Sequence, residues 1–312
     1  MTQGAFRARQ VRGQRGFSIL ELMVSMALGL LVLAAVFVSS AGMVVAGRQQ
    51  RAASVMTDDA LLALSLIRRD LLMAGYVHPV LINASQFSAL NSVVLSRPVF
   101  GCSTLFDDNS ADVAAGTCKP SSSTPSTPST PSTPSTATAS DAIEINFEAS
   151  QGSVDLSTDK KLTGCQGFEL KDDQGNVPSA AADVNTRLPT SHRYYVKDLT
   201  LSCATAGGTG QALVPNVETL QITYGVSSGW LIDQPDKRRP VRYVDAIHVT
   251  NWVDVVAVHL CVLMRSGEPV LDKGETATHG YTDCDGTAQT ASDGYLRRAY
   301  ATTVALRNRV AP

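Results

Sequence analysis

The chain has 312 residues, 44% of them hydrophobic and 17% charged, so it is not disordered as a whole and can bury one sizeable core. Its 26 Lys and Arg against 28 Asp and Glu give a net charge of −2, which argues against a protein that coats nucleic acid. The first 16 residues differ from the rest, because they hold Arg7, Arg9, Arg12 and Arg15 and no acid.

An apolar run follows this basic leader. Residues 22–47 are uncharged and mostly apolar, and as a helix they would be about 39 Å long, enough to cross a bilayer core of roughly 30 Å. We therefore predict one transmembrane helix over 17–47. Arginines before the run place the N-terminus in the cytoplasm and the C-terminal part on the other side of the membrane.

The start of the run does not look like an ordinary secretory signal. Its small residue, Gly16, precedes the apolar stretch, and Glu21 places a carboxylate near the start of a membrane helix. The sequence GFSILE at 16–21 resembles the type IV prepilin signal. That resemblance implies that a prepilin peptidase removes the leader 1–16 by cutting between Gly16 and Phe17, and methylates the Phe17 amine. A plain signal anchor is the alternative.

Glu21 has a physical role in this interpretation. In an assembly of such helices, the Glu21 carboxylate of one subunit can pair with the positively charged Phe17 amine of a neighbour inside the membrane. The pair would favour assembly and fix the axial register.

The helical pattern continues beyond the membrane over 48–75, with Gly75 as its C-terminal cap. Two apolar stripes follow this half: Val55, Leu62, Leu66 and Met73 form one, and Ala60, Leu64, Ile67 and Leu71 form the other. One stripe should pack on the protein's own sheet. The other either packs on sister helices in a filament or is also buried in the core.

Residues 76–312 are predicted to form a β-rich globular domain. Strand candidates lie at 93–95, 142–147, 193–201, 219–224, 253–263 and 296–306. The predicted fold class is therefore α+β, with a long N-terminal helix on an antiparallel β-sheet, as in type IV pilins. Within the region 119–140, residues 123–134 repeat Ser-Thr-Pro four times, which predicts a solvated, polyproline-like insert.

The six cysteines are dispersed and include no CxxC pair, which argues against a zinc ribbon or a thioredoxin-type motif. An even count in an exported domain suggests disulfides. Proximity along the chain favours Cys102 with Cys118, Cys165 with Cys203, and Cys261 with Cys284.

No motif indicates catalysis or a cofactor. The five histidines are scattered without HExxH spacing, no GxSxG is present, and His259 lies in an apolar strand where a structural role is expected. Asp283, Asp285 and Gly286 resemble part of a calcium loop, but the closing Glu is missing, so a solvated turn is the better interpretation. We expect no catalytic residue, no metal and no cofactor.

Five segments, taken in order after the prepilin signal, resemble the minor pilin family PilW: 71–76, 216–226, 252–260, 296–300 and 303–309. The resemblance implies a minor pilin that helps to initiate type IV pilus assembly, in a minor-pilin complex at the pilus tip, with roles in adhesion and twitching motility. Its implied partners are the prepilin peptidase, other minor pilins, the major pilin and the inner membrane, with a tip adhesin as a further candidate. The alternatives are a pseudopilin of a type II secretion system, and a membrane-anchored surface enzyme or binding module.

Overall fold

The computed structural model describes the following residues: 16, 18–77, 94, 96–107, 116–119, 140–149, 165, 188–205, 210–228, 238–271 and 278–309. The leader 1–15, Phe17 and the Ser-Thr-Pro repeat lie outside these residues. The chain divides into two compact units, Met1–Gln50 and Arg51–Pro312, which are described separately.

One helix, α1 (Ile19–Met73), supplies all the described structure of the first unit apart from Gly16 and Ser18. Leucine, valine, alanine and methionine dominate its first half, and every side chain described between Ile19 and Arg48 is exposed. It is long and apolar enough to cross a membrane. The helix predicted from the sequence is thus present, with each end within two residues of the predicted one.

The end of α1 is capped as the sequence predicted. Gly75 has φ +69°, a left-handed conformation that favours glycine, and its N–H donates to the Asn146 carbonyl at 2.8 Å. The Asn308 side chain donates to the Ala74 carbonyl at 3.1 Å. Asn146 and Asn308, both distant along the chain, therefore form hydrogen bonds at the C-terminus of α1, where the last carbonyls have no partner within the helix.

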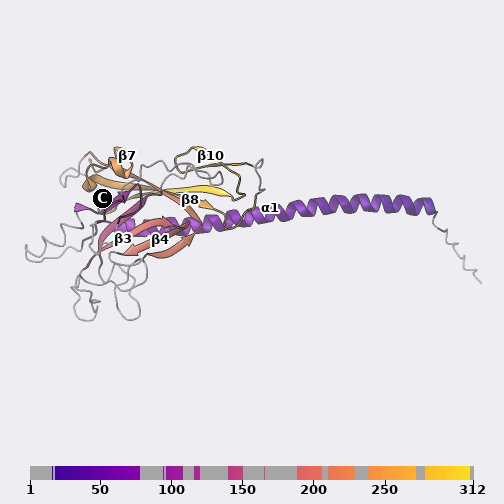
Figure 1. Cartoon of the computed structure of the whole chain (residues 1–312), viewed down its shortest axis with the longest axis horizontal. Coiled ribbons are helices and arrows are strands. Elements are labelled where there is room, and N and C mark those ends of the chain that lie inside the picture. Colours follow the sequence, from indigo (N-terminus) through magenta and orange to yellow (C-terminus); the bar gives the residue numbers. More distant parts are fainter. Residues whose placement is uncertain are drawn as a thin grey trace, which may run out of the picture. The chain divides into compact units, whose positions relative to one another are not determined.

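The second unit contains two main antiparallel sheets and a hairpin (Figure 1). The five-stranded sheet has the order β1 (Val99–Cys102), β2 (Ala142–Ala149), β3 (Leu188–Lys197), β4 (Thr200–Thr205) and β5 (Gln211–Pro215). The four-stranded sheet has the order β11 (Arg297–Ala305), β8 (Val255–Arg265), β6 (Val217–Val226) and β7 (Arg242–Val244). The hairpin pairs β9 (His279–Thr282) with β10 (Ala288–Ala291), and two short 3-10 turns, η2 (Ala246–His248) and η3 (Trp252–Asp254), precede β8.

The α+β class is confirmed, but the single predicted sheet is two. Asn216, with φ +62°, is the one residue between β5 and β6, where the chain passes from one sheet to the other. The strand predicted at 193–201 is instead a hairpin that turns at Asp198 and Leu199, which have φ values of 50° and 58°. The strand predicted at 93–95 is also wrong, because Val94 is helical and β1 begins at Val99.

One hydrophobic core joins α1 to both sheets. Its fully buried members include Ala60, Ile67 and Leu71 from α1, Ile143 and Ile145 from β2, Leu220 and Ile222 from β6, and Val258 and Leu260 from β8. Asp141, immediately before β2, links the sheets directly: its N–H donates to the Leu220 carbonyl and its Oδ2 accepts from the Ile222 N–H, both at 2.7 Å.

Candidate assembly site on the N-terminal helix

The predicted processing residues lie at the start of α1. Gly16 is exposed, and a Cβ added there would meet no atom within 4 Å. Glu21 lies in the first turn of the helix, where its negative charge is favourable beside the unpaired N–H groups. Phe17, the predicted partner of a neighbour's Glu21, lies outside the described residues.

Polar side chains in the apolar half hydrogen-bond to their own helix. Ser25 Oγ donates to the Glu21 carbonyl at 2.7 Å, and Ser40 Oγ donates to the Phe37 carbonyl at 2.9 Å. Since hydrocarbon offers no hydrogen-bond partner, hydroxyl groups satisfied within the helix suit a bilayer. This half of α1 can therefore lie in lipid or against other apolar helices.

The outer half of α1 has one buried and one partly exposed apolar stripe. Ala60, Leu64, Ile67 and Leu71 are buried in the core, whereas Val55 and Leu62 are 51% and 47% exposed. Leu66 and Met73 are half-buried at the edge of the core. Of the two alternatives for the second stripe, a fully buried face is wrong, and an outward surface remains that can contact other molecules.

A buried hydrogen-bond network attaches α1 to β3. Asp70 Oδ2 accepts from Tyr194 Oη at 2.5 Å and contacts His192 Nδ1 at 2.7 Å. His192 Nε2 in turn accepts the Cys165 N–H at 3.2 Å, which assigns the proton to Nδ1 and makes His192 a donor to Asp70.

The charge of Asp70 is stabilised in this network. Burial alone would raise the pKa of Asp70, but the hydrogen bonds from His192 and Tyr194 and the nearby Arg69 hold it below its usual value. Burial and the Asp70 carboxylate raise the pKa of Tyr194 well above its usual value, so its hydroxyl remains a donor. This network is not predictable from the sequence, because no local pattern marks two residues separated by 122 positions.

The closing segment of the chain holds the other side of α1. Thr57 Oγ1 lies 3.0 Å from Tyr300 Oη of β11, and Asn308 caps the helix end. Arg309 is buried and donates from Nη2 to the Val253 carbonyl at 3.1 Å. Its burial lowers the pKa of Arg309 to about 10, so the guanidinium stays charged at neutral pH.

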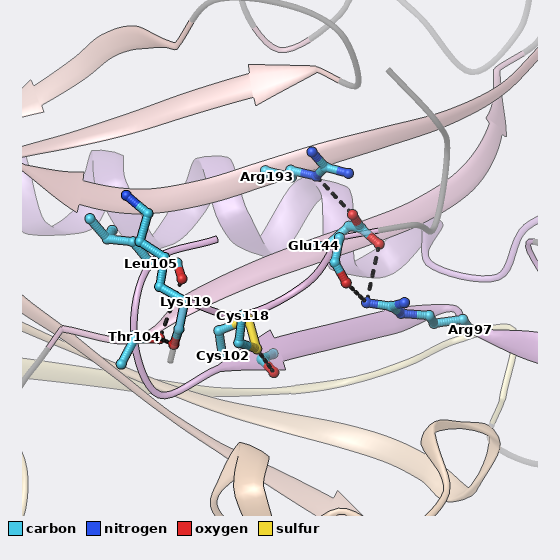
Figure 2. The surroundings of a disulfide bond; sticks show 10 residues. Arg97, Cys102, Thr104, Leu105, Cys118, Lys119, Glu144 and Arg193 are labelled. Carbon is cyan, nitrogen blue, oxygen red and sulfur yellow. Dashed lines mark hydrogen bonds and ion pairs between the residues drawn. A yellow bond between two sulfur atoms is a disulfide. The ribbon is translucent and has the colours of Figure 1, made fainter. Parts of the chain in front are cut away.

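All six cysteines are paired, and the pairs are those that proximity along the chain favoured: Cys102–Cys118, Cys165–Cys203 and Cys261–Cys284. The first pair lies beside a buried ionic cluster (Figure 2). In that cluster Arg193 Nε donates to Glu144 Oε2 at 2.8 Å, and Arg97 Nη2 lies 3.9 Å from Glu144 Oε1.

Asp283 and His259, which the sequence offered for metal or acid–base chemistry, make local hydrogen bonds. Asp283 Oδ1 accepts the backbone N–H groups of Asp285 and Thr287, which is the hydrogen bonding of a tight turn. His259 Nδ1 lies 2.8 Å from Thr303 Oγ1 on the neighbouring strand. In the part of the chain that the structure describes, no three His, Cys, Asp or Glu side chains are grouped to hold a metal ion.

The described residues form an apolar N-terminal helix and an antiparallel β domain, and family models match one segment of each. Residues 11–37 match the prokaryotic N-terminal methylation motif, and residues 189–308 match the family Type IV Pilus-assembly protein W (PilW). The chain is therefore similar to PilW pilins over its C-terminal β strands and to prepilins over its N-terminal signal.

A type IV-like pilin from Thermus thermophilus is similar with 16% sequence identity and a TM-score of 0.32, over 82% of this chain and 98% of that one. No curated protein matches the chain.

Proposed function

We propose that this chain is a minor pilin that helps to initiate type IV pilus assembly, in a complex with other minor pilins and the major pilin at the pilus tip. The observation that carries the proposal is the match to PilW on a chain whose N-terminus bears the methylation motif. An exposed apolar helix half supports it, because such a surface can leave lipid and pack against other pilin helices.

The proposed topology puts the leader in the cytoplasm and the β domain in the periplasm before the subunit enters the pilus. Four arginines precede the apolar run, which favours this orientation. Three disulfides in the second unit also favour it, since such bonds persist in the periplasm and are rare in the cytosol.

The proposed processing follows from the same signal. Prepilin peptidase cuts between Gly16 and Phe17 and methylates the new amine, and the Glu21 carboxylate then pairs with the Phe17 amine of a neighbouring subunit. Both groups would lie near the membrane interface or inside the membrane, where an unpaired charge is costly, so pairing favours assembly.

The proposal is tested by deleting the gene and counting surface pili, and by affinity purification of the tagged chain from membranes. Loss of pili together with co-purification of pilins is the expected result. Co-purification of secretion-system pseudopilins, with piliation unchanged, would instead assign the chain to a type II secretion system. Purification with neither set would favour a membrane-anchored binding module.

A further inference from the structure

Strand β11 is the longest edge strand of the two main sheets. It has nine residues, and its pairing with its one neighbour, β8, contains no register shift. The other edge strands are shorter: β1 has four residues, β7 has three, and β5 has five, ends at Pro215 and pairs with β4 through a register shift. Short strands, prolines and bulges normally keep an edge from pairing with another chain, and β11 has none of these three protections.

Alternate residues of β11 turn their backbone groups away from β8. The Leu306 N–H donates to the Val256 carbonyl at 2.9 Å, and the antiparallel register then directs the backbone groups of Val304 and Thr302 toward β8 as well. The backbone groups that point outward belong to the residues between these: Ala299, Ala301, Thr303 and Ala305. In the part of the chain that the structure describes, no backbone group hydrogen-bonds to this outer side of the strand.

The residues with outward backbone groups leave room for another strand. All four have small side chains, which are exposed at Ala301, Thr303 and Ala305 and half-buried at Ala299. A strand about 4.8 Å from β11 can therefore hydrogen-bond to these groups, and its side chains can pack beside alanine and threonine without a clash. Only a polypeptide in an extended conformation matches such a row of donors and acceptors.

The charge of this edge favours an acidic partner. Residues 296–312 include four arginines and no Asp or Glu. Arg298 and Arg307 are exposed near the two ends of β11, and neither has an ion-pair partner among the described residues. The other two are engaged within the protein, because Arg297 pairs with two carboxylates and Arg309 is buried.

We propose that β11 binds an extended, acidic segment of another protein, which joins the four-stranded sheet as a fifth strand. The segment carries carboxylates near both ends, opposite Arg298 and Arg307, and small or β-branched residues between them. A second copy of this chain does not fit, since two β11 edges paired in either direction bring arginine beside arginine. The inference depends on the exposed edge and not on a role in pilus initiation.

Binding of defined peptides to the purified full-length chain in detergent tests the charge preference. The probe is a fluorescent peptide of alternating threonine and valine with two glutamates at each end, and the matched peptide has lysines in place of the glutamates. We expect the glutamate peptide to bind at least about tenfold more tightly. The double variant Arg298→Glu and Arg307→Glu should reverse this preference. Equal binding of the two peptides to the wild-type chain would overturn the proposal.

Two variants at Ala301 test the addition of a strand. Ala301→Pro removes an outward N–H that β8 does not use, a change that edge strands tolerate, whereas Ala301→Ser keeps this donor. We expect the proline variant to bind the glutamate peptide about tenfold more weakly and the serine variant to bind it as the wild type does. Equal binding by two folded variants would contradict the proposed hydrogen bonding.

Amide hydrogen exchange of the wild-type chain gives a test that needs no variant. Saturating glutamate peptide should slow exchange at least about tenfold at Ala299, Ala301, Thr303 and Ala305, and leave Thr302, whose N–H faces β8, unchanged. No slowing at the outward positions, or self-association of the chain through β11 that the peptide competes with, would overturn the proposal. Neither measurement depends on piliation, so failure at this edge is distinguishable from failure of the proposed function.

Discussion

At the scale of single residues, Asp141 makes the stability of the fold depend on pH. Its burial raises the pKa of Asp141 to about 7, against the opposing hydrogen bond from the Ile222 N–H, and the charges of Asp245 and Asp285 raise it further. Between pH 4 and 7 the folded chain keeps a proton that the unfolded chain releases. The contribution of Asp141 to the free energy of unfolding is therefore lost as pH rises through this range.

Asp141→Asn should remove this pH dependence. We expect the free energy of unfolding of the wild-type chain to fall by on the order of 4 kcal/mol from this group between pH 4 and 7, and the variant to be flatter over that range. Urea unfolding of the chain in detergent at several pH values measures it. Identical pH profiles for the two proteins would show that Asp141 does not titrate in this range.

The Asp70 carboxylate should also contribute to stability. Asp70→Asn keeps the size of the side chain but leaves the donors of His192 and Tyr194 with a weaker, neutral acceptor inside the protein. We expect a loss of about 2–3 kcal/mol in the free energy of unfolding. Asp245→Asn, at an exposed position, is the matched control and should change it by less than about 0.5 kcal/mol. Equal effects of both substitutions would contradict the role assigned to the network.

Gly16 and Glu21 should have separable effects. A β-branched side chain next to the cut should block the peptidase, so Gly16→Val should leave the full precursor in the membrane. Glu21→Ala should be cleaved normally but enter pili poorly, because a neighbour's Phe17 amine loses its partner. Mass spectrometry of the membrane form measures both, with Glu21→Asp as the variant that keeps the charge. Normal removal of the leader from Gly16→Val would contradict the prediction.

At the scale of elements, the sequence predicted those helices and strands that the periodicity of apolar residues indicates. The long helix, its glycine cap and four of the six predicted strands follow from hydrophobic periodicity and from one glycine. The turn at Asp198 and Leu199 could not be predicted this way, because two non-glycine residues adopt left-handed conformations there. Likewise, the division into two sheets depends on Asn216 and on contacts between distant segments. Gly16 and Glu21 were recognisable because their signal is local, whereas Asp70 and His192 meet only in the folded chain.

The C-terminal strand β11 and the residues after it should contribute more to stability than their exposure suggests. β11 is an edge strand of its sheet, yet it pairs with β8 over nine residues and leads to Asn308. Asn308→Ala removes the hydrogen bond to the Ala74 carbonyl and should cost about 1 kcal/mol in the free energy of unfolding. Arg307→Ala, also exposed, is the control and should be nearly neutral. Thermal denaturation of the two variants distinguishes them.

Truncation at Asp293 should be far more damaging. It removes β11, the Thr57–Tyr300 contact and the helix cap together, and it takes the buried side chains of Val304 and Leu306 out of the core. We expect the second unit to unfold and pilus initiation to be lost. A protease-resistant, piliated truncation would show that the core of α1 and β8 does not need its edge strand.

At the scale of the whole molecule, covalent and hydrogen-bonded anchors hold both ends of the Ser-Thr-Pro region. At one end, Cys102–Cys118 spans 16 residues, and the Lys119 N–H donates to the Leu105 carbonyl at 2.9 Å. At the other, Ser140 Oγ accepts the Leu220 N–H at 3.0 Å. The repeat at 123–134 lies outside the described residues, but the described residues that flank it, Lys119 and Ser140, are held by these contacts.

Deleting 123–134 should therefore leave the fold intact, whereas removing the Cys102–Cys118 disulfide that precedes it should destabilise the fold. Loop closure changes by only about 0.6 kcal/mol per doubling of length, so the deletion should alter stability by less than about 1 kcal/mol and preserve piliation. Replacing Cys102 and Cys118 together by serine removes a cross-link worth about 3 kcal/mol in the chain-entropy model, and it frees the segment that covers Glu144. Protease resistance and surface pili are compared for both variants, after thiol labelling has shown no free cysteine in the parent chain. If the deletion abolishes piliation while the serine variant remains resistant and piliated, the repeat is the partner-binding element and the disulfide loop is dispensable.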